Sequence, residues 1–507
     1  MSFIRKLKRN GRIYLAEVEN KRDGAKVRQR IVRYIGLQPD HDRKAFPKNI
    51  GEMKIDGSRV FGSVMALDFI AKQIGLYPLL GEHAKVIMAL VFCHCHDYQS
   101  VVKAERWFKK TDLSQILGIG EVSEKMLRDA LAALDKIDQL ALQKSIFENV
   151  LRFSGVKPSS VVYDVTNTYF TGTCAKLGKQ GKDKEGVKGR ALIQIGLVVT
   201  KEHAFPIFHQ VHPGNIHDSK IFDEAVVHLK QFGISGGTIV YDRGITAKNS
   251  VWELSGENWK VIAGMPMHRG IKKILSKMDL GDLESYRNRI EQGVTTFYVT
   301  TTSYTFGKVR GKLIVLLNPR KKQSQKEARI RNIVEAQRNF LAKKDIEPKF
   351  KVFLTKDGNV NSHAIKREEK LDGLSFIFTN GKFSRQEIVR LYFEKDLIEK
   401  SFHAFKGVLS LRAIRMWLDE NVKAHVLVCY LGYTLLATFR FLLYKNRQKS
   451  KLDGISVEEA LDELADVYRV YFHRDGLDPE TNQLSKLVTL SSRQERILLA
   501  ISKDLVM

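Results

Sequence analysis

Short apolar runs rich in β-branched residues recur between residues 159 and 242, and they restrict this part of the chain to a fold built on a sheet. The runs cover residues 161–164, 191–200 and 238–242, and residues 217–229 between them have the pattern of a helix. Runs of this length and composition predict strands. Strands alternating with a helix in this way predict a layered α/β domain.

The rest of the chain differs in pattern from this α/β part. With 507 residues, the chain is too long for one hydrophobic core of ordinary size. Changes of pattern predict six segments: a basic β-hairpin region at 1–55, a helical region at 56–155, a strand-rich α/β region at 156–270, a basic insertion at 271–380, a second part of the α/β region with a charged helix at 381–450, and a helical C-terminal region at 451–507. The helical region at 56–155 is either a DNA-recognition unit or a plain helical bundle, because both would show the same pattern.

The N-terminal segment carries a hairpin signal. Two β-rich runs, residues 12–18 and 27–33, flank the turn dipeptide Asp23-Gly24. Arg28, Arg30 and Arg33 make the second run strongly basic. The predicted ribbon either lies against a phosphate backbone or is a solvated edge, and the sequence does not separate the two.

The charge of the chain points to a polyanionic partner. Lys and Arg number 84 and Asp and Glu 57, which gives a net charge of +27. Nucleic acid is the first candidate, because each basic side chain placed on a phosphate releases a condensed counterion. A basic surface that serves only solubility is the alternative.

Cysteine usage and hydropathy favour a reducing compartment and no membrane. The four cysteines, Cys93, Cys95, Cys174 and Cys429, form no regular framework of pairs, which fits a reducing cytoplasm. Residues 1–10 are basic without an apolar run, so no signal peptide is expected. The most apolar stretch, residues 426–439, is shorter than the roughly 18 residues that span a bilayer, and it predicts a buried helix.

Two aspartates share one local context. Asp164 and Asp242 each end an apolar run with the letters Val-Tyr-Asp. Strand ends in α/β sheets present side chains into the crevice where sites are built. Two carboxylates placed together repel, and a divalent cation such as Mg²⁺ relieves that repulsion. The alternative is that each Asp caps a turn.

A third acid lies on a predicted helix. Tyr392, Glu399 and Lys406 are spaced by sevens, and Lys395 lies three residues after Tyr392 and four before Glu399. On one continuous helix, all four side chains project from the same face. The amines would hold phosphates while the acid holds metal. A surface helix with ordinary ion pairs would show the same pattern.

Three other groups of reactive side chains are weaker candidates. Cys93-His-Cys-His96 has poor spacing for zinc, and no second Cys/His pair follows at zinc-finger distance. His209, His212 and His217 with Asp218 could bind a transition metal, but the turn at residues 213–215 divides them and loop histidines are usually surface groups. Cys174 has no apparent base partner.

The stretch Tyr392-Phe-Glu-Lys395-Asp-Leu-Ile-Glu399-Lys-Ser-Phe-His-Ala-Phe-Lys406 resembles the YREK signature, Y-x2-R-x3-E-x6-K, of bacterial insertion-sequence DDE transposases of the insertion-sequence-four type. The spacing matches in full, with Lys395 in the usual arginine place. Asp164 in Tyr-Asp-Val-Thr and Asp242 in Tyr-Asp-Arg-Gly resemble the first and second aspartates of that family. Similar features outside these motifs are Pro213-Gly-Asn215 with Asp218, Leu371-Asp-Gly373, Thr379-Asn380 and Ala424-His425.

The resemblance covers residues 160–440 and implies an RNase H-like catalytic core with a largely β insertion between Asp242 and Glu399. It implies that Asp164, Asp242 and Glu399 are catalytic and bind two Mg²⁺ or Mn²⁺ ions. Tyr392, Lys395 and Lys406 would then contact phosphates of the transposon end, although a lysine cannot make the two-pronged contact of arginine.

The function implied by the resemblance is cut-and-paste DNA transposition. The enzyme would cleave double-stranded DNA at the ends of its insertion sequence, through a hairpin, and join the ends to target DNA. It would act as a homodimer on paired ends, in the cytoplasm of a bacterium or archaeon and at the nucleoid. Two rival hypotheses are a catalytically silent or domesticated DNA-binding regulator and an RNase H-like nuclease with another nucleic-acid substrate.

Overall fold

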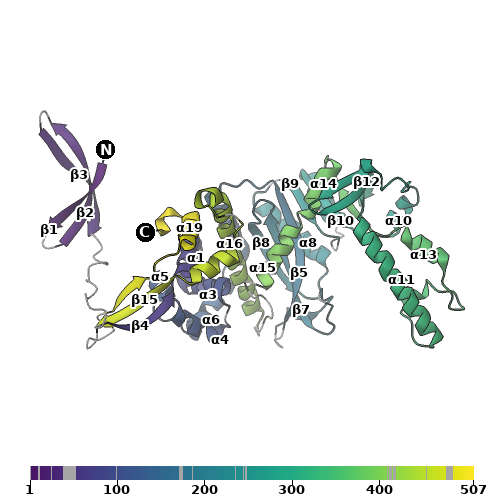
Figure 1. Ribbon diagram of the computed structural model, residues 1–507, viewed down its shortest axis with the longest axis horizontal. Helices are drawn as coiled ribbons and strands as arrows, with labels where there is room; N and C mark the ends of the chain where they lie inside the picture. The colour runs from purple at the N-terminus through teal and green to yellow at the C-terminus, as the bar shows by residue number, and fades with distance from the viewer. Residues whose placement is uncertain are drawn as a thin grey trace. The chain divides into compact units, whose positions relative to one another are not determined.

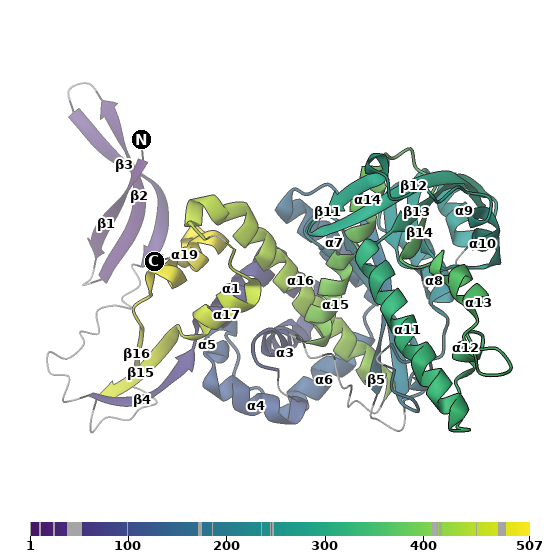
Figure 2. The same cartoon turned by 45° about the vertical axis from the view of Figure 1, so that its right-hand side comes forward.

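The computed structural model divides the chain into two compact units, residues 1–59 with 468–489, and residues 60–467 with 490–507. The structure describes residues 2–9, 12–23, 26–37, 53–98, 100–170, 175–184, 186–234, 236–243, 245, 248–407, 409, 411, 414, 418–452, 454–474 and 483–506. Figures 1 and 2 show the elements from two sides.

The described residues of the first unit form two three-stranded sheets. One contains β1 (Ser2–Arg9), β2 (Arg12–Asp23) and β3 (Lys26–Leu37) in that order. Asp23 pairs with Lys26, which confirms the predicted hairpin around Asp23. The other contains β16 (Leu484–Leu487), β15 (Tyr468–Arg474) and β4 (Met53–Val60). The C-terminal segment is therefore not purely helical, because its run of aromatic and β-branched residues at 468–472 favours a strand.

The second unit begins with a predominantly helical region, as the sequence predicts. Its helices are α1 (Gly62–Gln73), α2 (Leu76–Leu79), α3 (Ala84–His96), α4 (Val101–Lys110), α5 (Leu113–Leu117), α6 (Glu124–Asp135) and α7 (Gln139–Ser154). The predicted cap residue Ser123 begins α6, and its hydroxyl accepts the backbone N–H of Met126. Two short C-terminal helices, α17 (Val457–Ala465) and α19 (Ser492–Ile501), begin with capping boxes.

One mixed ten-stranded sheet forms the α/β part. The strands are β5 (Ser160–Phe170), β6 (Lys179–Gln180), β7 (Ala191–Thr200), β8 (Pro206–Pro213), β9 (Gly237–Tyr241), β10 (Trp259–Met265), β11 (Arg289–Gln292), β12 (Thr295–Phe306), β13 (Val309–Leu317) and β14 (Leu374–Thr379). Their order is β11-β12-β13-β14-β10-β9-β5-β7-β6, and β8 pairs with β7. The three central strands β5, β9 and β10 are parallel, and β7 and β8 are antiparallel to their neighbours. Helices α8 (Asp218–Gln231) and α9 (Lys248–Gly256) connect them.

The predicted insertion at residues 271–380 is not largely β. Its strands β11 to β14 extend the central sheet, and its longest element is the 23-residue helix α11 (Pro319–Leu341). This helix begins at a strong start signal, since Asn318 accepts the backbone N–H of Lys321 and Pro319 occupies the first turn. The shorter helices of the insertion are α10 (Arg269–Leu275), α12 (Pro348–Lys351) and α13 (Ser362–Glu369). Helix α11 extends away from the sheet with α13 alongside (Figure 1).

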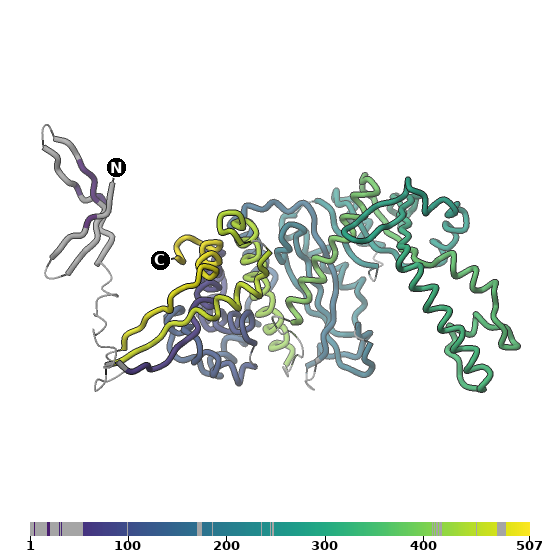
Figure 3. The backbone as a smooth tube through the Cα atoms, in the orientation of Figure 1, coloured from purple at the N-terminus to yellow at the C-terminus, as the bar shows by residue number. Residues whose placement is uncertain are grey.

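The last part of the core is helical. It contains α14 (Arg385–Phe393), α15 (Asp396–Lys406) and α16 (Asp419–Ser450). Helix α16 is longer than the predicted apolar stretch, and its length and composition would allow it to cross a membrane, but 94% of that apolar window is buried inside the protein. It packs against α3, α19 and β8, which is the position of a core helix. Figure 3 traces the backbone, with residues 419–450 in yellow-green.

Candidate active site

Asp164 and Asp242 lie side by side at the centre of the sheet. In the parallel pair β5/β9, Tyr163 is in register with Tyr241, and each aspartate directly follows one of these tyrosines. Asp242 follows the last residue of β9, as expected. Asp164 does not end its strand, because β5 continues to Phe170 by pairing with β7. The two Val-Tyr-Asp sequences thus bring two carboxylates to one edge of neighbouring strands.

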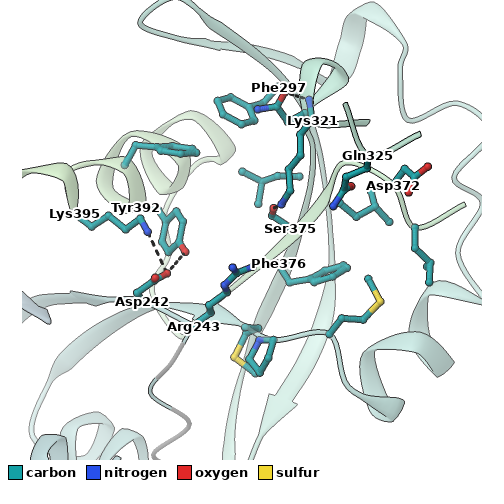
Figure 4. A pocket seen from close by; sticks show the side chains of 18 of the residues that line it. Asp242, Arg243, Phe297, Lys321, Gln325, Asp372, Ser375, Phe376, Tyr392 and Lys395 are labelled. Carbon is teal, nitrogen blue, oxygen red and sulfur yellow. Dashed lines mark hydrogen bonds and ion pairs between the residues drawn. The ribbon is translucent and has the colours of Figure 1, made fainter. Parts of the chain in front are cut away.

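The YREK residues do not lie on one continuous helix. Tyr392 is near the end of α14, and the chain turns at residues 394–395 before α15, which carries Glu399 and Lys406. Despite this break, two of the side chains meet at the second aspartate. The Tyr392 hydroxyl donates to Oδ1 of Asp242 at 2.9 Å, and Nζ of Lys395 lies 3.2 Å from the same oxygen (Figure 4).

The third acid joins the same site. Nζ of Lys395 lies 3.6 Å from Oε1 of Glu399, one helical turn away. Asp164, Asp242 and Glu399 line one cleft of about 850 Å³. Lys406 is not among the residues lining this cleft; it lies seven residues after Glu399, about two turns along the same face of α15. The structure therefore brings the three predicted acids together with Tyr392 and Lys395.

The surroundings of Asp164 raise the pKa of its carboxyl group. Burial raises its pKa from 3.8 to about 6, and the negative charge of Asp242 acts in the same direction. The ammonium of Lys184 opposes this rise, as does the backbone N–H of Val165, which donates to Oδ1 at 2.8 Å. The net result is a carboxyl that keeps its proton up to a higher pH than an ordinary aspartate and that ionises more readily when a cation approaches.

The pKa of Asp242 is lowered, in contrast to that of Asp164. Burial acts to raise its pKa, but the Lys395 ammonium, the backbone N–H of Arg243 and the Tyr392 hydroxyl together lower it. Burial and the charge of Asp242 raise the pKa of Tyr392, so the phenol stays protonated and remains a hydrogen-bond donor. Neighbouring acids whose environments push their pKa values apart are typical of functional sites.

The donor set of the cleft fits hard divalent cations. Three carboxylates supply only oxygen ligands, which Mg²⁺ and Mn²⁺ prefer. The repulsion between Asp164 and Asp242 is the kind of unfavourable interaction that such a cation removes. Asp164, Asp242 and Glu399 are accordingly the residues that could hold metal ions here.

Sequence reasoning missed two residues that shape the site. Lys184 contacts the carbonyl oxygen of Val165, and its Nζ lies 3.7 Å from Oδ2 of Asp218, which also lines the cleft. Gly264 on β10 lies against the YREK tyrosine, where a Cβ atom would come within 2.5 Å of the Tyr392 hydroxyl. Neither residue has a local signal, since Lys184 is one of several lysines in a loop and Gly264 lies inside an ordinary strand pattern.

A second cavity, of about 540 Å³, adjoins the site. Asp242, Tyr392 and Lys395 line one part of it, and residues of the insertion line another part (Figure 4). Among the latter, Nζ of Lys321 donates to the Ser375 hydroxyl at 3.2 Å. The insertion therefore contributes polar side chains beside the carboxylates.

The weaker candidate group of histidines does not assemble. His209 and His212 line a separate cavity of about 380 Å³ together with His228, whereas His217 lines the carboxylate cleft. Cys174 lies outside the described residues.

Comparisons with known proteins identify a family match. A family model described as "Transposase DDE domain" matches residues 157–435. A comparison with curated proteins finds no match. Among solved structures, a cryo-EM structure of the piggyBac transposase synaptic complex with hairpin DNA is 10% identical, with a TM-score of 0.39 over 79% of this chain and 78% of the other. A likeness this low bears neither on the fold nor on the function.

Proposed function

The chain belongs to the transposase DDE domain family, whose members cleave DNA and transfer strands, and from this premise we propose that it is the cut-and-paste transposase of an insertion sequence of the insertion-sequence-four type. The observation that carries the proposal is the convergence of Asp164, Asp242 and Glu399 on one cleft. The YREK spacing supports the subtype, because Tyr392 and Lys395 both reach the second aspartate.

An RNase H-like core is part of this proposal. It is supported by the strand order β8-β7-β5-β9-β10, in which the first acid lies on the central strand and the second follows its parallel neighbour. The assignment of the helical region at residues 56–155 to DNA binding is also part of this proposal.

The three carboxylates would hold two Mg²⁺ or Mn²⁺ ions, which supply activation of the attacking oxygen and stabilisation of the leaving 3′-oxygen when bound. Neighbouring side chains set the charge and the orientation of these carboxylates. Lys395 and Tyr392 keep Asp242 ionised and fix the orientation of its carboxylate through Oδ1. Lys184 opposes the rise in the pKa of Asp164. The site thereby presents ionised oxygens close to neutral pH.

Tyr392, Lys395 and Lys406 would also contact phosphates of the transposon end. The support is electrostatic: a phosphate cannot approach three carboxylates unless cationic side chains offset the repulsion. Lys182, Lys184 and Arg243 line the cleft beside the acids and add positive charge there. We further propose cleavage through a DNA hairpin, joining to target DNA by a homodimer on paired ends, and action at the nucleoid in the cytoplasm of a bacterium or archaeon.

The decisive experiment is a cleavage assay on DNA carrying the flanking ends of the gene itself. Purified protein and its Glu399→Gln variant are incubated with this DNA, with and without Mg²⁺ or Mn²⁺. We expect metal-dependent cuts at the element boundary that the variant lacks while it still binds the DNA. Binding without cleavage by the natural protein would favour a regulatory role, and cuts that ignore the ends would favour a nuclease with another substrate.

A further inference from the structure

A buried cluster of nitrogen and sulfur ligands lies outside the carboxylate cleft. His94 on α3 meets His425 and Cys429 on α16, and the ligand atoms of the three side chains all lie within 4.8 Å of one another. All three residues are buried, with exposed fractions of 2%, 4% and 0%. His425 and Cys429 are four residues apart and therefore project from one face of α16 towards α3.

Both imidazoles are oriented by backbone carbonyl groups. Nδ1 of His94 lies 2.8 Å from the carbonyl oxygen of Leu409, and His425 bonds to the carbonyl of Leu411. Burial lowers the pKa of His94 to about 4 and that of His425 to about 3, so both rings are neutral. A neutral ring that donates its one N–H to a carbonyl keeps a lone pair on its other nitrogen. Metal-binding histidines commonly donate their second ring N–H in this way. Zinc would then bind His94 through Nε2, because Nδ1, which lies 3.8 Å from Sγ of Cys429, is the nitrogen that faces Leu409.

The carbonyl groups that orient the histidines belong to the segment following the catalytic helix. The N–H of Leu409 donates to the carbonyl of Ala404 at 2.9 Å, and the N–H of Leu411 donates to that of Phe405 at 3.0 Å. Ala404 and Phe405 lie in the last turn of α15, the helix that carries Glu399. A continuous series of hydrogen bonds therefore joins the cluster to the end of α15.

We propose that His94, His425 and Cys429 bind one structural zinc ion, which joins α3 to α16 and fixes the end of α15. Imidazole nitrogen and thiolate sulfur are the ligands that zinc prefers, in contrast to the oxygen ligands of the cleft. Structural zinc sites have four ligands. Cys95 on α3 lies outside the group of three and donates to the carbonyl of Gly432 on α16 at 3.8 Å, so it would have to turn from that carbonyl to supply the fourth.

Binding requires that the cysteine lose its proton. Burial raises the pKa of Cys429, so the thiol stays protonated until a cation is present. On binding, the sulfur–hydrogen bond breaks, the proton leaves to solvent, and the sulfur lone pair forms the bond to zinc without any change of oxidation state. Affinity should therefore fall as the pH is lowered.

The test uses the full-length chain and needs no transposition. The protein is supplied with zinc, passed over a desalting column and analysed by mass spectrometry for metal content, and a second sample is loaded with Co²⁺ for absorption spectroscopy. We expect about one zinc ion per chain. We also expect a thiolate-to-cobalt charge-transfer band, which the carboxylate cleft would not produce because none of the described residues that line it carries sulfur.

Cys429→Ser should lose the band and at least nine-tenths of the retained zinc, and Cys93→Ser is the matched control. Cys93 is also buried on α3, but it lies outside the group of three and its Sγ donates to the carbonyl of Asp97. Should Cys429→Ser fail to fold, the cobalt spectrum of the natural protein still decides. Folded natural protein that shows neither zinc retention nor the charge-transfer band would overturn the proposal and leave a hydrogen-bonded core cluster.

Discussion

The hydroxyl of Tyr392 donates a hydrogen bond to Oδ1 of Asp242, with 2.9 Å between the two oxygen atoms. This contact joins α14 to the residue that directly follows β9, and it requires an empty space between the two elements. Gly264 on β10 provides that space, because a Cβ atom there would lie 2.5 Å from the Tyr392 hydroxyl and 2.7 Å from the backbone nitrogen of Arg243. The glycine acts here through close approach and not through an unusual backbone angle.

Gly264→Ala should therefore displace the tyrosine and slow DNA cleavage. The added methyl group overpacks the site, and we expect a loss of about 1–3 kcal/mol of stability. The measurements are the cleavage rate in Mn²⁺ and the urea unfolding midpoint. In a Tyr392→Phe background the hydroxyl is gone, so Gly264→Ala should cost less stability than in the natural protein. Equal costs in the two backgrounds would contradict this account.

The sequence alone could predict the positions of the first two acids because their signal is local. The Val-Tyr-Asp sequences end apolar runs that form neighbouring strands, and equal positions in parallel strands fall side by side. The hairpin at Asp23 is predictable for the same reason. What the spacing could not reveal is the turn between Tyr392 and Glu399, because residues spaced by seven fit one helix as well as two.

Contacts between distant segments left no signal in the sequence. The motif at Cys93–His96 predicts no zinc site by its own spacing, yet the structure places His94 against His425 and Cys429, which come from a helix far along the chain. Gly264 matters only because Tyr392 packs on it. No local pattern predicts that the strands of the insertion extend the central sheet, because the pairing of β14 with β10 is a long-range contact.

Asp164→Asn should stabilise the protein at pH 8 in the absence of divalent cations. The folded-state pKa of about 6 exceeds the ordinary value of 3.8, so the native state binds the proton more tightly. The stability from this group is fully present below pH 4 and is lost as the pH rises through 6, by roughly 3 kcal/mol. Urea unfolding of both proteins at pH 4 and pH 8 measures the difference.

The control for this prediction is the addition of Mn²⁺ at pH 8. The cation should raise the unfolding midpoint of the natural protein, because it binds the ionised carboxylates, and it should have little effect on Asp164→Asn. If the difference in stability between the two proteins is the same at pH 4 and pH 8, the pKa of Asp164 is not raised.

Asp372→Ala should strongly destabilise the insertion. Nη1 of Arg329 on α11 donates to Oδ1 of Asp372 at 2.8 Å, and Nη2 bonds to the second carboxylate oxygen. Their side chains are only 10% and 9% exposed. Removing the carboxylate leaves a nearly buried guanidinium without its partner, which costs about 3–5 kcal/mol. Urea unfolding of Asp372→Ala, Arg329→Ala and the double variant should show that the two costs are not additive.

Lys406→Ala should weaken the binding of transposon ends and flatten its dependence on salt. Lys406 lies on the face of α15 that carries Glu399, about two turns away, where it can reach a phosphate next to the cleft. Loss of one phosphate contact reduces the slope of log affinity against log salt by about one. Lys400→Ala is the matched control, because Lys400 is an exposed lysine of the same helix that points about 120° away from Lys406. Binding of labelled end DNA is titrated at several salt concentrations, and an equal slope for Lys406→Ala and Lys400→Ala would remove Lys406 from the DNA interface.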